Sequence, residues 1–250
     1  GGGEGPGELK ATPGDRNNLA GTINARAEAF DELAAGAALT LTYPGRATEG
    51  SAALDNQTVV ITITGSNDTP DITVVGTDSA AQTLAESNAA LSTSGTLTVV
   101  DADLSDTVTP SVVSVVAGGT TAGLGSNNAA LAAMLSVGPA SINANPGDSN
   151  NLNWTFNSAA EAFDYLAAGE SLTLTYTVRA TDGNAALDNQ TVVITITGSN
   201  DTPDITVVGT DSAAQTLAES SATLSTSGTL TVVDADLSDT VTPGVVSVVA

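Results

Sequence analysis

Apolar and polar residues alternate one by one along several short stretches of the chain. In residues 172–178 the apolar side chains take the even positions and threonines take the others. Residues 192–197 repeat this alternation, and residues 97–99 show it inside GTLTVVD. A period of two is typical of β-strands with one buried face, and the many Thr and Val residues favour strands as well. The pattern predicts an all-β chain.

Two stretches depart from the alternation. Residues 158–168 (SAAEAFDYLAA) end just before Gly169 and predict a short helix, and residues 129–135 are a second candidate. The remaining short strands, separated by Gly and Asn-Asp turns, predict an antiparallel Greek-key β-sandwich.

The strand pattern recurs along the chain with an offset of 133 residues. GSNDTP occurs at residues 65–70 and again at 198–203, and residues 52–87 recur unchanged as 185–220. DADLSD and AEAFD follow the same offset. Such close self-similarity indicates tandem duplication, and tandem units mostly contact their immediate neighbours.

The offset divides the chain into three parts. Residues 1–70 are the C-terminal part of a degenerate repeat, 71–203 a complete repeat, and 204–250 the N-terminal part of the next. Pro44 and Gly45 interrupt what should be a central strand of the first part, where proline is normally excluded. We therefore expect residues 1–70 to be poorly ordered, or their sequence to contain reading errors.

The strongly negative charge of the chain limits the molecules that it can bind. The chain has 28 acidic and 5 basic residues, and its formal net charge is -23. Such a field repels nucleic acid and anionic lipid and attracts divalent cations. No stretch approaches the roughly 18 apolar residues of a membrane-spanning helix. We expect no nucleic-acid partner and no membrane insertion, and neighbouring repeats of the same chain as partners.

Cysteine and histidine are both absent. Disulfides, zinc sites built on thiolate or imidazole, and Ser-His or Cys-His nucleophile pairs are therefore excluded. A carboxylate pair remains chemically available. Asp164 and Glu170 lie in one repeated segment without an aromatic cleft, however, and we interpret them as a helix end and a strand start. The chain is expected not to be an enzyme.

Several carboxylates continue the apolar face of a strand. The odd-numbered face of Leu97 and Val99 leads directly to Asp101 and Asp103, and the even-numbered face of 172–178 leads to Asp182. Alternation places these carboxylates on the core side, where each strand leaves the core. A buried carboxylate is costly without a counter-charge, and a hard cation would supply one.

Calcium is the cation that this pattern favours. It accepts six to eight oxygens in flexible geometry, whereas magnesium requires a strict octahedron. The segment DADLSDTVTPSV is not an EF-hand loop, because it lacks the glycine at its sixth position and the glutamate at its twelfth. The alternative is that the aspartates keep the protein soluble and cap turns.

The order of four segments along the chain resembles the VCBS/cadherin-like repeats of giant bacterial surface adhesins of the RTX type. The segments are LAES, GTLTVVDADLSD, FDYLAAGESLTLTYTVRATDG and TVVITITGSNDTP. It is also similar to the cadherin pattern of a glutamate near the first strand, a D-x-D, an A-T-D and an x-N-D-x-x-P linker. The resemblance covers the middle unit and both partial ones. It implies tandem cadherin- or immunoglobulin-like sandwiches, each with one short helix, at the bacterial cell surface or in the extracellular space.

The resemblance also implies a calcium site at each junction between units. At the head of the middle unit the ligands would be Asn67, Asp68, Glu86, Asp101, Asp103 and Asp182, with Asp106 as an outer ligand or a solvated charge. At the next junction they would be Asn200, Asp201, Glu219, Asp234 and Asp236, with Asp239 in the role of Asp106. Cadherins add a glutamate from an L-D-R-E segment of the preceding domain, which is missing here, and only Asp164 or Glu170 could replace it. We expect the carboxyl oxygens of Asp101, Asp103, Asp182 and Glu86 to gather within about 5–8 Å at one pole.

The function implied by the resemblance is that of an extender. Calcium-stiffened repeats would project a distal adhesive module, whose target the sequence does not reveal. An alternative is a spacer or accessory module of a secreted, polysaccharide-degrading enzyme. A third reading, carbohydrate binding by the repeat itself, would need an exposed aromatic cluster.

Overall fold

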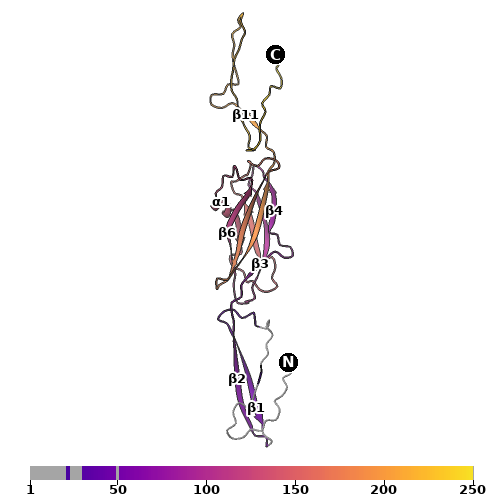
Figure 1. Ribbon diagram of the computed structural model, residues 1–250, viewed down its shortest axis with the longest axis vertical. Coiled ribbons are helices and arrows are strands. Elements are labelled where there is room, and N and C mark those ends of the chain that lie inside the picture. Colours follow the sequence, from indigo (N-terminus) through magenta and orange to yellow (C-terminus); the bar gives the residue numbers. More distant parts are fainter. Residues whose placement is uncertain (1–20, 23–29, 49–50, 250) are drawn as a thin grey trace.

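The computed structural model describes residues 21–22, 30–48 and 51–249. The chain is drawn out along one axis, with the β1–β2 hairpin at one end, a sandwich in the middle and residues 204–249 at the other end (Figure 1). The elements are β1 (Ala38–Thr48), β2 (Leu54–Thr64), β3 (Asp71–Thr73), β4 (Ala81–Ala85), β5 (Ser92–Val100), β6 (Thr109–Gly119), α1 (Asn128–Ala133), β7 (Leu135–Gly138), β8 (Leu152–Asn157), β9 (Ser171–Thr181), β10 (Leu187–Thr197), β11 (Asp204–Thr206) and β12 (Thr231–Val233).

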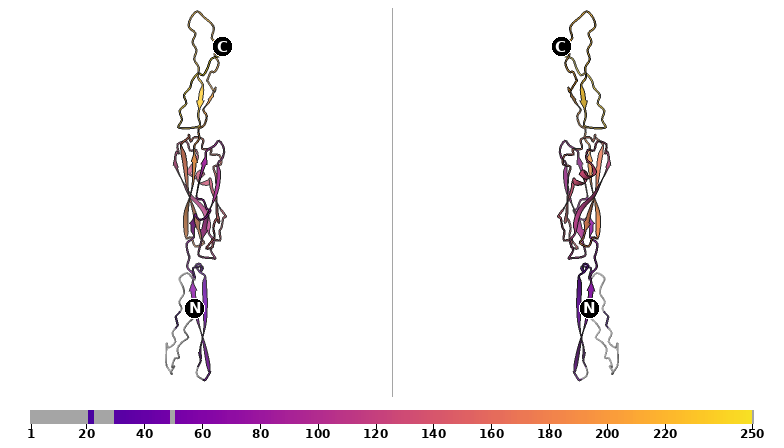
Figure 2. Two further views of the ribbon diagram at one scale, coloured as in Figure 1. Left: turned by 90° about the vertical axis from the view of Figure 1, so that its right-hand side faces the viewer. Right: turned by 90° about the vertical axis from the view of Figure 1, so that its left-hand side faces the viewer.

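The middle unit is a β-sandwich of two four-stranded sheets. One sheet has the order β4-β10-β9-β6 and the other β3-β5-β8-β7. The chain changes sheet at every step from β3 to β7 and again between β8 and β9, which gives Greek-key connectivity. Both side views show the two layers with their strands along the long axis of the molecule (Figure 2). The expected all-β sandwich is confirmed.

The core lies between the two sheets and follows the alternation of the sequence. Every second residue of β9 is buried, and β8 alternates between buried and exposed positions along its whole length. Trp154, Phe156 and Tyr176 are fully buried, and the rings of Phe156 and Tyr176 meet edge to face with centroids 6.3 Å apart. Aromatic side chains of this size contribute much of the apolar area that a sandwich buries.

The strand directions define two ends of the middle unit. β5 and β9 finish, and β10 begins, at the end that receives the linker of residues 66–70, here called pole 1. β10 finishes at the opposite end, pole 2, which leads into residues 198–203. β4 pairs with β10 in parallel, so it also finishes at pole 2. All other strand pairs in the described part of the chain are antiparallel.

The helix prediction for residues 158–168 is wrong. That stretch forms turns, because the backbone is left-handed at Ala159 (φ 53°) and Phe163 (φ 64°) and no helix can pass through such residues. The second candidate is the helix: α1 begins after Asn127, whose side chain caps it by accepting a hydrogen bond from the Ala130 amide.

The expected interruption at Pro44 and Gly45 is also wrong. β1 continues through both residues and pairs with β2, with Pro44 opposite Thr58. In the described part of the chain β1 has β2 as its one partner strand, and an edge strand tolerates the missing amide of proline. Residues 1–20 and 23–29 lie outside the described residues, so the expectation of poor order there stays a prediction.

Candidate metal site

Pole 1 brings together carboxylates from two strands of the sandwich. Asp101 and Asp103 follow the end of β5, Asp182 follows the end of β9, and all three are buried. Alternation predicts this burial, because each residue continues the core-facing side of its strand. None of the three has a basic residue next to it in the sequence.

The linker of residues 66–70 is fastened to these carboxylates. The side-chain amide of Asn67 donates to Asp182 Oδ2 at 2.7 Å, and the backbone amide of Asp68 donates to Asp103 Oδ2 at 2.8 Å. The backbone amide of Asp103 donates in turn to Asp101 Oδ1 at 3.1 Å. Residues more than a hundred positions apart in the sequence therefore form one connected polar network at this pole.

Asn184 is a member of this network that the sequence analysis missed. Its side-chain amide donates to Asn67 Oδ1 and, at 3.3 Å, to Asp106 Oδ2. Its backbone amide donates to Asp182 Oδ1 at 2.9 Å, within the tight turn between β9 and β10. Asp106, expected as an outer ligand or a solvated charge, therefore lies at the rim of pole 1.

Burial and repulsion from neighbouring carboxylates make two acidic residues at pole 1, Asp101 and Asp68, weaker acids. Burial raises the pKa of Asp101, and the carboxylates of Asp103, Asp182 and Asp106 raise it further, against the lowering effect of the Asp103 amide. The pKa of Asp68 is raised by burial and by Asp103 and Asp31. Such shifts are typical of like charges held together without a counter-ion.

Glu86 lies at pole 2, and its expected place beside Asp101 and Asp103 is wrong. Its backbone amide donates to Thr197 O at 2.9 Å, at the end of β10, whereas Asp182 N bonds to Ala186 O next to the beginning of β10. The ten residue steps between Leu187 and Thr197 amount to about 33 Å. The physical reason is that β4 pairs in parallel with β10 and carries Glu86 away from pole 1. Glu219 stands in the repeat where Glu86 stands in the middle unit and is exposed, and its expected place beside Asp234 and Asp236 stays a prediction.

Pole 2 repeats the network of pole 1 and adds Glu86 to it. The amide of Asp201 donates to Asp236 Oδ2 at 2.8 Å, and the amide of Asp236 donates to Asp234 Oδ1 at 3.1 Å. Glu86 Oε1 accepts bonds from the backbone amide and the hydroxyl of Ser199. Burial, Glu86, Asp236 and Asp234 together raise the pKa of Asp201. The remaining predicted residues of this junction lie beside the network: Asn200 donates to Asp201 O at 2.6 Å, and Asp239 N donates to Asp236 O at 3.1 Å.

Asp164 also belongs to pole 2, although it was only an open candidate in the sequence. Burial raises its pKa, and the carboxylate of Asp201 raises it further. Asp31 is the counterpart of Asp164 one repeat earlier, and its carboxylate raises the pKa of Asp68 at pole 1. Glu170 does not join them: its carboxylate accepts the Ala167 amide at 3.1 Å. The signal available in the sequence was the retention of AEAFD in both units.

Both poles contain buried carboxylate oxygens without a hydrogen-bond donor, which is the kind of oxygen that a bound cation would satisfy. The described residues with such an oxygen are, at pole 1, Asp101 (Oδ2) and Asp103 (Oδ1), and, at pole 2, Glu86 (Oε2), Asp164 (Oδ1), Asp201 (Oδ2) and Asp236 (Oδ1). A buried charged oxygen with no partner costs free energy. Within the described part of the chain, however, no three acidic side chains stand in the arrangement of a ready metal cage. Asp101, Asp103 and Asp182 thus lie at one pole without Glu86, and their gathering within about 5–8 Å stays a prediction.

The buried charge of Asp101 should lower the stability of the middle unit when no cation is added. In a chelating buffer Asp101→Asn is expected to stabilise the middle unit, on the order of 1 kcal/mol, because it removes a buried charge and Asn Oδ1 can keep the Asp103 amide bond. Thermal unfolding of this variant, with exposed Asp55→Asn as a charge-matched control, measures the effect. A lower melting temperature for Asp101→Asn than for Asp55→Asn would contradict it.

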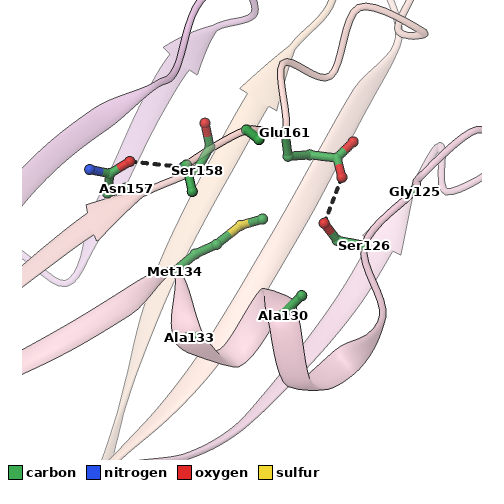
Figure 3. A pocket seen from close by; sticks show the side chains of 10 residues that line it. Gly125, Ser126, Ala130, Ala133, Met134, Asn157, Ser158 and Glu161 are labelled. Atoms are coloured by element: carbon green, nitrogen blue, oxygen red, sulfur yellow. Dashed lines mark hydrogen bonds between the residues drawn. The ribbon is translucent and has the colours of Figure 1, made fainter.

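An open pocket lies on the side of the sandwich, beside α1. Small side chains, Met134 and Glu161 line it, and the Ser126 hydroxyl donates to Glu161 Oε2 at 2.6 Å across it (Figure 3). The pocket borders the pole 2 network, because the carboxylate of Glu161 also raises the pKa of Asp164. No helix in the described part of the chain is long and apolar enough to cross a membrane.

Comparison with known proteins finds a likeness among solved structures. No protein-family model matches the chain, and no curated protein matches it. The chain is similar to the protocadherin GammaB4 extracellular domain, at 15% sequence identity and a TM-score of 0.35. The match covers 68% of this chain and 23% of that one. A likeness of this size carries no argument about function, and the sandwich is established by the sheets themselves.

Proposed function

We propose that this chain is an extender segment of an extracellular, bacterial surface adhesin, and that calcium at its junctions stiffens it. The role is mechanical and not catalytic. The observation that supports it best is the pair of polar networks at poles 1 and 2, in which linker residues and sandwich carboxylates meet and buried oxygens lack donors. The motif order of VCBS/cadherin-like repeats supports the same function.

Without a cation, the two networks oppose a straight chain. Asp68 of the linker lies against Asp103 of the sandwich, and Asp201 lies against Asp236 in the same way. Each contact brings a backbone amide to one oxygen of a carboxylate and leaves negative charges facing each other. The backbone hydrogen bond holds the linker against the sandwich, whereas repulsion between the carboxylates favours a bend of the linker away from the sandwich.

Bound calcium would supply the missing positive charge and coordinate several oxygens at once. At pole 1 the residues that would hold it are Asp68, Asp101, Asp103 and Asp182, with the Asn67 carbonyl oxygen. At pole 2 they are Asp164, Asp201, Asp234, Asp236 and Glu86. Because these residues come from both sides of a linker, fixing them together would fix the angle between neighbouring units.

The test is the response of the 250-residue chain to calcium. At millimolar calcium and a dissociation constant of about 10 μM, binding to the folded state alone adds roughly 2.7 kcal/mol per site. That is a large share of a typical domain stability of about 5–15 kcal/mol. We expect a higher melting temperature and a longer maximum dimension in small-angle scattering when calcium is added, and a much smaller response to magnesium.

A double variant locates the response. Asp101→Asn with Asp103→Asn should abolish most of the calcium-dependent stabilisation of the middle unit at pole 1, because it removes the two buried oxygens without donors. Asp55→Asn, a change at an exposed position, should keep the full response. If neither calcium nor chelator changes the melting temperature or the scattering curve, the acidic residues of both networks serve solubility only. The extender proposal is then wrong.

A further inference from the structure

The turn between β9 and β10 contains a residue pair that is prone to spontaneous rearrangement. Gly183 follows Asp182, and this is the one Asp-Gly pair in the sequence, which has no Asn-Gly pair. A glycine has no side chain to keep other groups away from its amide nitrogen, so the carboxyl carbon of a preceding aspartate can reach that nitrogen. In the sequence Glu49 precedes Asp182 by one repeat, and a glutamate would have to form a larger ring.

The turn exposes the main chain at this pair but holds the carboxylate in place. Gly183 is exposed, whereas Asp182 is 7% exposed. Asp182 Oδ1 accepts the backbone amide of Asn184 at 2.9 Å and that of Ala186 at 2.8 Å. Both donors belong to the turn itself, so these two hydrogen bonds form whenever the turn does.

A further hydrogen bond to the carboxylate comes from the linker. The side-chain amide of Asn67 donates to Asp182 Oδ2 at 2.7 Å, across a separation of 115 positions in the sequence. Rearrangement requires the carboxyl carbon of Asp182 to swing against the Gly183 nitrogen, and this rotation breaks the hydrogen bonds to both oxygens. Hydrogen bonds to a charged group are the stronger kind. The linker therefore restrains the carboxylate as long as it lies at pole 1.

We propose that Asp182–Gly183 is a modification site, at which aspartate converts spontaneously to isoaspartate, and that the linker controls the rate through Asn67. The Gly183 nitrogen bonds to Asp182 Cγ, and one water leaves, formed from the carboxyl OH and the amide proton. A water molecule then adds to the main-chain carbonyl carbon of Asp182, and the original bond from that carbon to the Gly183 nitrogen breaks. The chain now runs through the former side chain, and its mass and charge are unchanged.

The product does not fit pole 1. Isoaspartate adds a methylene group to the main chain of a turn that the 3.0 Å bond from Asp182 N to Ala186 O closes. It also moves the carboxylate away from the position that Asn67 contacts. A junction whose linker stays detached for long would thus lose the ability to dock it again. This inference depends on the linker contact and not on a bound cation, so it is tested in chelating buffer, separately from the proposed function.

The test incubates the 250-residue chain for several weeks at physiological pH and temperature. Isoaspartate at residue 182 is then measured by mass spectrometry with electron-transfer fragmentation. Asn67→Ala removes the linker donor and should speed the conversion about 10-fold, because the loss of one hydrogen bond to a charged group corresponds to roughly this factor. Asn189→Ala is the matched control, since Asn189 is exposed and contacts Arg179 instead of Asp182. It should leave the rate unchanged.

Gly183→Ala separates the chemistry from the folding. A Cβ at Gly183 would meet no atom within 4 Å, and its backbone is not left-handed, so alanine should fit without changing the melting temperature. Its methyl group hinders the nitrogen, and the isoaspartate signal should be lost, also when Asn67→Ala is present. Equal rates in Asn67→Ala and Asn189→Ala, an undiminished signal in Gly183→Ala, or faster conversion at other aspartates than at Asp182 would overturn the proposal.

Discussion

Replacing Trp154 by alanine is expected to lower the free energy of unfolding of the middle unit by about 3–5 kcal/mol. Trp154 is fully buried between the sheets, and its indole N–H donates to Ser79 O at 2.8 Å. The change therefore leaves a cavity and also an unpaired carbonyl oxygen. Urea unfolding followed by far-ultraviolet circular dichroism measures the loss. Thr155→Ala, at the next and exposed position of β8, should cost less than about 1 kcal/mol.

Gly95 provides a second measurement of the same contact. A Cβ at this position would lie 2.6–2.8 Å from three atoms of the indole ring, so Gly95→Ala should destabilise the unit by about 1–3 kcal/mol. In the Trp154→Ala background the space is empty, and Gly95→Ala should then cost little. Additive losses in this double-mutant cycle would contradict direct packing of Gly95 against Trp154.

Gly198→Ala is expected to have the second-largest effect, a loss of about 3 kcal/mol at the upper end of overpacking costs. A Cβ on Gly198 would overlap the carbonyl oxygens of Leu166 and Ala167, and backbone atoms cannot move aside as a flexible side chain can. The shift would also stretch the 3.0 Å bond from Gly198 N to Glu170 O. Gly65 meets Leu33 and Ala34 in the same way.

Gly118→Ala is the matched control for Gly198→Ala. Gly118 lies in β6, and a Cβ there would meet no atom within 4 Å. Its substitution should leave the unfolding midpoint nearly unchanged or raise it slightly, since alanine restricts the unfolded chain. If Gly198→Ala unfolds at the same denaturant concentration as Gly118→Ala, the close approach of the linker to residues 166–167 is not a constraint on the fold.

Alternation along the strands was sufficient to predict the fold. Leu97, Val99 and the even residues of 172–178 occupy the core because side chains alternate across a strand, which is a local property of the chain. The helix was misplaced because residues 158–168 have helical composition, while Phe163 and Leu166 are drawn into the core in a left-handed turn. Tertiary packing determines the conformation of residues 158–168, and the local composition does not show this.

The candidate site was predictable where it follows from local geometry. The burial of Asp101, Asp103 and Asp182 follows directly from the faces of β5 and β9. The place of Glu86 depends on which strand β4 joins and in which direction, and no local pattern records a parallel pairing across more than a hundred residues. The role of Asp164 depends on a turn near the end of the middle unit, and in the sequence only the recurrence of AEAFD pointed to it.

The parallel pairing of β4 with β10 determines how the middle unit bears tension. Both strands run from pole 1 to pole 2 and align Ala81 with Val193 and Ala85 with Thr197. A pull on the two linkers first loads β3, which follows residues 66–70 and pairs with β5. It then draws the beginning of β4 toward pole 1 and the end of β10 toward pole 2, so these two strands are sheared past each other. The hydrogen bonds between them lie across the direction of force and are loaded together, whereas peeling would break them one after another. Forced unfolding is governed by the unfolding rate, and in this geometry that rate depends on the joint rupture of one short ladder at the edge of a sheet.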